Sequence, residues 1–179
     1  LDEGLNDEQF VDLFKVVIGK TVETYQPGAI VLQCGADSLT RDRLGRFNLT
    51  LHGHSECVKI CRSFGIPLMI LGGGGYTIRN VARCWAYETA VALNKTIDGT
   101  IPANDFWLYY APDFQLHLEP RKDLVNLNTP EQLNKIKQQC LSNIDALDSA
   151  QGVDFAYVPQ ELMKAIKQLA GDAEKMGLD

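Results

Sequence analysis

Apolar residues recur at helical spacing along much of this chain. The first such pattern runs from Phe10 to Val22 and follows Asn6, a residue type that caps helices well. It predicts an amphipathic helix that ends near Tyr25, before a proline and a glycine, and packs on the sheet that follows. Similar patterns, each starting after a threonine, predict further helices over 78–93 and 130–147.

Two short apolar runs, at 29–34 and 67–70, predict β-strands, and a helix is expected between them over 54–64. A strand, a helix and a second strand at this spacing predict parallel neighbouring strands. The first run is apolar throughout, so we expect it to be buried on both faces. Parallel strands end at the same edge of a sheet, where ligands bind in open α/β proteins. The sequence therefore predicts an α/β fold in which Asp37 and Tyr76 face one crevice.

Composition narrows the class of protein. The chain has 179 residues, of which 45% are hydrophobic, and a net charge of −6. This charge argues against direct nucleic-acid binding as the main role, because phosphate contacts need clustered Lys and Arg. No apolar run approaches the ~20 residues that span a bilayer, so no membrane partner is expected. Five scattered cysteines without a C-x-x-C pair predict a reducing compartment and no disulfide framework. Because the chain starts at Leu1 and its first methionine is Met69, we expect it to be part of a longer protein.

The residues after the two strands are the main candidates for chemistry. Asp37 is either a cap for the following turn or a hard oxygen ligand for a divalent metal. The second strand leads into four successive glycines at 72–75, which allow backbone to approach a ligand closely. A phosphate-binding loop is the rival interpretation, but neither Gly-Lys-Ser/Thr nor a third glycine at the required spacing follows. Tyr76 has two interpretations: it is an ordinary core or surface residue, or its hydroxyl donates a hydrogen bond to an oxyanion as charge develops.

Two further groups of polar residues have both a structural and a functional interpretation. His52, His54, Cys57 and Cys61 form a possible metal cluster, although the two cysteines, one helical turn apart, fit buried core positions better. Five arginines flank the predicted crevice, as a solvated charged face or as an anion site. They are Arg41, Arg43, Arg46, Arg79 and Arg83.

Several motifs in order resemble the class I zinc-dependent histone deacetylases. The motifs are QCGADSL at 33–39, DRLG at 42–45, FNLT at 47–50, LGGGGYTIRNVARCW at 71–85, YET at 87–89 and YAPDF at 110–114. The resemblance runs from residue 1 to 147 and weakly to 159. It implies that 1–159 are the C-terminal part of a deacetylase catalytic domain, while 160–179 are expected to form an amphipathic helix over 160–170 and a tail.

The resemblance also implies a fold and a site. The fold would be arginase/deacetylase-like, with a central parallel sheet flanked by helices, of which this chain is about half. Asp37 would bind one zinc ion, and Tyr76 would stabilise the tetrahedral intermediate of acetyl-lysine hydrolysis. Leu44, Gly73 and Gly74 would line the substrate channel. Arg43 and Arg79 would bind an inositol phosphate.

The implied function is deacetylation of histone tails in the nucleus, with a possible cytoplasmic pool, as a transcriptional repressor with corepressor subunits. The resemblance implies that the remaining zinc ligands and the paired catalytic histidines lie upstream of this stretch. None of the three histidines present, His52, His54 and His117, forms an Asp-x-His motif. We therefore expect the fragment alone to be inactive. Two alternatives stay open: a truncated, non-catalytic homologue that binds partners, and an arginase-like two-metal hydrolase.

Overall fold

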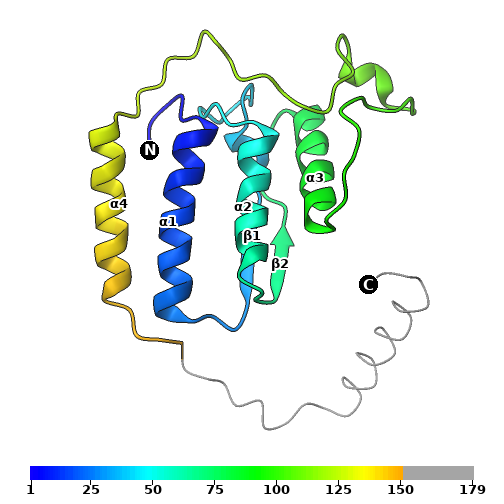
Figure 1. The fold of residues 1–179 in the computed structure, drawn as a ribbon. Helices are drawn as coiled ribbons and strands as arrows, with labels where there is room; N and C mark the ends of the chain where they lie inside the picture. The colour runs from blue at the N-terminus through cyan, green and yellow to red at the C-terminus, as the bar shows by residue number, and fades with distance from the viewer. Residues whose placement is uncertain (151–179) are drawn as a thin grey trace, which may run out of the picture.

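The computed structural model describes residues 1–150 and consists of helices around a small parallel sheet (Figure 1). Its α-helices and strands are α1 (Asp7–Tyr25), β1 (Ile30–Gln33), α2 (Leu51–Ser63), β2 (Leu68–Leu71), α3 (Ile78–Ala92) and α4 (Pro130–Asp145). Two 3-10 turns, η1 (Ala36–Ser38) and η2 (Trp107–Tyr110), complete the regular structure of this part of the chain. The helix expected over 160–170 and the boundary at 159 lie outside the described residues.

Side-chain capping accounts for where α1, α2 and α4 begin, whereas the Thr77 hydroxyl before α3 donates to the Arg41 carbonyl at 3.0 Å instead of capping the helix. The side chain of Asn6 accepts a hydrogen bond from the Gln9 amide at 3.0 Å, which starts α1 as predicted. Thr129 caps α4 in the same way. α2 begins earlier than expected, at Leu51, because the Thr50 hydroxyl caps it by accepting from the His52 amide.

The two strands are parallel neighbours, which confirms the prediction from the strand–helix–strand pattern. Ile30 is paired with Leu68, and the register continues to Gln33 opposite Leu71. The α/β fold class is therefore confirmed. Both strands end at the same edge, directly before the two motifs that carry the candidate site.

The expectation that the first strand is buried on both faces is wrong. Leu32 and Ile70 pack on one face of the sheet against Val58 of α2 and Val91 of α3. On the other face the side chains of Val31 and Met69 are 63% and 59% exposed. A short apolar run predicts a strand but not how many of its faces are covered by other elements. Within residues 1–150, helices cover one face of this sheet.

Helix α1 packs differently from the expectation as well. It was predicted to cover the sheet, but it lies between α2 and α4 (Figure 1). Asp7, in its first turn, accepts hydrogen bonds from the backbone amide and the hydroxyl of Thr50. These bonds join the start of α1 to the start of α2 and so turn α1 toward the helix layer.

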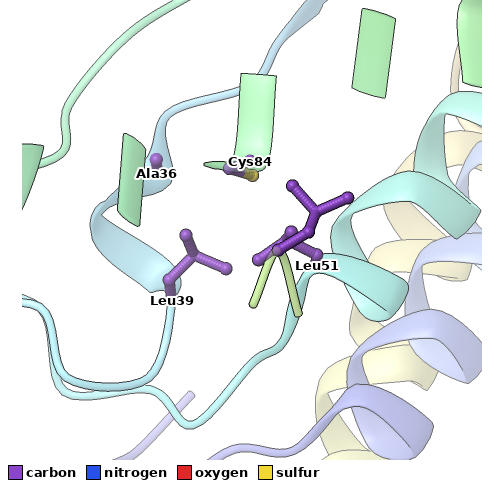
Figure 2. Packing of buried hydrophobic residues seen from close by; sticks show 5 residues of the cluster. Ala36, Leu39, Leu51 and Cys84 are labelled. Carbon is purple, nitrogen blue, oxygen red and sulfur yellow. The ribbon is translucent and has the colours of Figure 1, made fainter. Parts of the chain in front are cut away.

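A compact apolar cluster lies behind the end of β1. Figure 2 shows its side chains pointing toward one another from η1, α2 and α3. Its buried members are Ala36, Leu39, Leu51, Cys84 and Leu116. Because Ala36 and Leu39 flank Asp37 and Ser38, the core holds this turn from both sides.

The segment after α3 is mostly irregular and passes over the helix ends to reach α4 (Figure 1). Leu116 is part of the core, whereas Phe106, Leu108 and Tyr109 are exposed. The segment thus both completes the core and presents aromatic surface. Among residues 1–150, no helix combines the length and the apolar character that crossing a bilayer requires.

Candidate active site

Asp37 lies at the carboxyl end of β1, on the turn η1, and is half-buried. The Ala36 amide donates a 2.6 Å hydrogen bond to the Gly74 carbonyl, which joins this turn to the glycine loop after β2. The Asp37 carboxylate faces Gly74 so closely that a Cβ at that position would overlap its Oδ2 atom. The absence of a side chain at Gly74 therefore allows the backbone of this loop to lie against the Asp37 carboxylate.

Within residues 1–150, no N–H or O–H group donates a hydrogen bond to the Asp37 carboxylate. This contrasts with Asp7 and Asp42, whose carboxylates each accept from backbone amides. A half-buried carboxylate with free lone pairs has the donor chemistry of a hard oxygen ligand. Asp37 thus fits the role of a single metal ligand.

Tyr76 ends the glycine loop, and Asp42 holds it there. The Tyr76 amide donates to Asp42 Oδ2 at 2.8 Å, while Asp42 Oδ1 accepts from the amides of Leu44 and Gly45 at 2.8 and 2.9 Å. The Tyr76 side chain is 45% exposed and that of Leu44 67%. One carboxylate therefore joins the Tyr76 and Leu44 loops into one rim.

These hydrogen bonds also change the pKa of Asp42. Burial by itself would raise the pKa, but the amides of Gly45, Tyr76 and Leu44 stabilise the ionised form more strongly. The net effect holds the pKa of Asp42 below its usual value. No sequence pattern pointed to this role, because Tyr76 lies 34 residues from Asp42 along the chain.

The arginines separate into different environments. Arg83 is buried and donates to the Gln115 carbonyl at 2.8 Å and to Asp113 at 3.3 Å, so it joins α3 to the following segment. Arg79 and Arg41 line one surface hollow of about 460 Å³. Arg43 lines a second hollow of about 210 Å³, which Arg41 also borders. The two predicted anion ligands therefore lie in separate hollows, with Arg41 common to both.

The four-residue cluster of His52, His54, Cys57 and Cys61 does not assemble. His52 stacks on His117 with ring centroids 4.5 Å apart, whereas His54 faces Ser38 and Glu88. Burial raises the pKa of Cys57 to about 12, with smaller contributions from neighbouring Cys61 and Cys34. Both cysteines of the cluster are thus buried core residues, the structural interpretation of the sequence.

One other group of possible metal ligands lies together in the part of the chain that the structure describes. It comprises His54, Cys84 and Glu88, all buried, and it does not include Asp37. Burial, followed by the charge of Glu88, raises the pKa of the Cys84 thiol far above its usual value. A thiol that stays protonated is a poor metal ligand, so the group fits a hydrogen-bonded core cluster better than a metal site.

Comparison with known proteins gives the family. A family profile described as the histone deacetylase domain matches residues 1–92, more than half of the chain.

The chain belongs to the histone deacetylase family.

Three relatives illustrate the similarity. Histone deacetylase 1 of Homo sapiens is 52% identical over 161 residues, which are 90% of this chain and 33% of the human protein. Histone deacetylase 1 of Oryza sativa subsp. japonica is also 52% identical, over 90% of this chain and 31% of its own length. Histone deacetylase 6 of Arabidopsis thaliana is 50% identical over 89% of this chain and 34% of its own length. The chain thus spans about a third of the length of these relatives.

Proposed function

We propose that this chain supplies part of the active site of a zinc-dependent histone deacetylase. The reaction is hydrolysis of the acetyl-lysine amide on histone tails, which yields acetate and free lysine. The supporting observation is the placement of Asp37: its carboxylate lies at the carboxyl edge of the sheet, against the glycine loop, with its lone pairs free of donors from residues 1–150.

Asp37 would be one zinc ligand, and among the described residues no group of three or more candidate ligands includes it. Catalytic zinc sites normally have three protein ligands, so the others would come from residues outside this stretch, as would the general base. Bound zinc would polarise the acetyl carbonyl and acidify a water molecule. The contribution of this chain to metal binding is therefore a single, positioned carboxylate.

Tyr76 would donate its hydroxyl proton in a hydrogen bond to the oxygen that gains charge in the transition state. Its backbone amide is held by Asp42, so the loop position is set while the exposed ring stays free to meet substrate. Gly73 and Gly74 would give the acyl-lysine channel room near Asp37, and exposed Leu44 would form its apolar rim.

The partners follow from the same assignment. Corepressor subunits would bind the complete enzyme, with nuclear transcriptional repression as the outcome. Arg43 and Arg79 would contact an inositol phosphate, a role supported by their exposure and by the hollows that each lines beside Arg41. Both arginines offer forked donors that match phosphate oxygens.

Replacement of Tyr76 by phenylalanine tests the catalytic assignment in the complete enzyme. We expect deacetylation of an acetylated histone peptide to fall by ~10²–10³-fold in kcat with zinc content unchanged, because one oxyanion donor is lost. Tyr25→Phe is the matched control, since Tyr25 is similarly exposed, at 42%, but ends α1. Full activity of the Tyr76 variant would refute the role.

A second candidate is a non-catalytic homologue that acts by binding partners. The observation in its favour is that the described residues gather one carboxylate, not a ligand set, at the sheet edge. Zinc content and turnover of an acetyl-lysine peptide by the complete protein discriminate between the two. Stoichiometric zinc together with acetate release excludes the non-catalytic role.

A further inference from the structure

Three side chains that are distant in sequence form a continuous chain of hydrogen bonds behind Asp37. His54 of α2 lies between Glu88 of α3 and Ser38 of the turn η1. Its Nδ1 is 3.2 Å from Glu88 Oε1, and its Nε2 is 2.6 Å from Ser38 Oγ. His54 and Glu88 are 7% and 3% exposed, so the interactions are shielded from water.

The chemistry of the groups gives this chain a direction. An ionised carboxylate can only accept hydrogen bonds, so Nδ1 of His54 carries the proton that faces Glu88. In a neutral imidazole Nε2 is then the acceptor, and it receives the single hydroxyl proton of Ser38. The Gly35 carbonyl, at 3.4 Å from the Ser38 oxygen, is the weaker of the two possible acceptors. With Glu88 ionised and His54 neutral, Glu88 thus sets the imidazole tautomer that accepts from Ser38.

The chain has a geometric connection to the candidate site because Ser38 directly follows Asp37. The Asp37 carboxylate meets the glycine loop, while the next side chain along the turn is tied to two helices. Burying an imidazole and a carboxylate is costly unless both are hydrogen-bonded, so the three groups stabilise one arrangement together. A rotation of the turn that moved Asp37 would break the 2.6 Å contact of Ser38.

We propose that His54 and Glu88 are positioning residues for Asp37, because the chain Glu88–His54–Ser38 anchors the turn that presents its carboxylate. The proposal rests on the assignment of Asp37 as a zinc ligand. Outer partners of metal ligands orient them, and their removal typically costs ~10–100-fold in metal affinity. Here the outer partner holds the backbone beside the ligand rather than the ligand atom itself.

The test measures zinc affinity of the complete enzyme by competition with a chelator, in variants that interrupt the chain. Ser38→Ala and His54→Gln are expected to weaken zinc binding by ~10-fold or more. Ser55→Ala is the matched control: Ser55 is also buried and hydroxyl-bonded, but its partner is the His52 carbonyl within α2. We expect this control to keep wild-type affinity, and Ser38→Thr, which retains a hydroxyl, to restore most of the loss.

Asp37→Asn separates this proposal from the proposed function. If zinc affinity is unchanged in Asp37→Asn, the assignment of Asp37 as a ligand fails. If Asp37→Asn weakens zinc binding but Ser38→Ala and His54→Gln stay within twofold of wild type, the ligand assignment stands and the positioning role is overturned. Should His54→Gln fail to fold, Ser38→Ala decides, because it removes one oxygen from a half-buried side chain.

A second measurement is independent of zinc. The Leu39 amide donates to the Ala36 carbonyl at 3.3 Å across the turn, so its hydrogen exchange reports on turn opening. Exchange should be at least ~10-fold faster in Ser38→Ala and unchanged in Ser55→Ala. Equal exchange of the Leu39 amide in the wild type, Ser38→Ala and Ser55→Ala would overturn the anchoring role. Labelling of Ser38 by a fluorophosphonate would also overturn it, since that would identify Ser38 as a nucleophile.

Discussion

The two halves of the candidate site are supported in different ways. The turn with Asp37 is flanked by Ala36 and Leu39, 1% and 0% exposed, and tied to two helices through Ser38. The loop with Tyr76 lies at the surface, where the Tyr76 amide donates to Asp42 and the Thr77 hydroxyl donates to the Arg41 carbonyl. The metal-binding half is therefore built into the core, while the tyrosine half depends on contacts between loops.

This difference suits the two chemical roles. A metal ligand is useful only when its oxygen is held in place before the metal arrives, so packing around it is favourable. A tyrosine that meets substrate needs access, and a loop on the rim provides it. This difference between the two halves can be tested by two substitutions and by acid pH.

Leu39→Ala tests whether the core supports the Asp37 turn. Leu39 is fully buried, so its truncation should lower the free energy of unfolding by about 2–5 kcal/mol, measured by urea denaturation. Leu44→Ala on the exposed rim is the control and should change it by no more than about 0.5 kcal/mol. Equal losses at the two leucines would remove the distinction between the two halves.

Gly45→Ala tests the close contact between the rim and the Asp37 turn. A Cβ on Gly45 would overlap the Asp37 carbonyl oxygen, so we expect a loss of about 1–3 kcal/mol in unfolding free energy. Gly19→Ala, within α1, has open space around the new methyl group and should instead stabilise the protein by about 0.5–1 kcal/mol. A neutral Gly45 variant would contradict the contact.

Acid pH should affect the two halves unequally. Because the folded-state pKa of Asp42 is lowered, its carboxylate contributes stability above the ordinary Asp value of about 3.9 and loses it as pH falls through the lower folded pKa. The Tyr76 amide should then exchange faster with solvent as pH falls through this lowered pKa, apart from the intrinsic pH dependence of exchange. Asp42→Asn should remove this extra change, and the Leu39 amide, which donates to a carbonyl, should not show it.

The sequence predicted those features that depend on neighbouring residues. Asn6 and Thr129 cap their helices through amides three positions away, and the parallel strands bring Asp37 to the glycine loop. The His54–Glu88 contact joins residues 34 positions apart, and helical periodicity contains no information on which residues of two helices meet. The connection of Asp42 to Tyr76 was missed for the same reason.

The error about the sheet has a similar physical origin. Alternating exposure in β1 is a property of the layers around a strand, whereas its first three residues, Ile30 to Leu32, are all apolar. The sequence therefore predicted the strand and its direction but not the uncovered face.

The uncovered face bears on the solution behaviour of the chain. Val31 and Met69 lie opposite each other on the two strands as exposed apolar residues, and within residues 1–150 no further strand pairs with the outer edges of this sheet. Such a surface favours concentration-dependent self-association, which a net charge of −6 opposes only at long range and at low ionic strength. Salt and protein concentration therefore govern the colloidal state of this chain more strongly than they would for a sheet sandwiched between two helix layers.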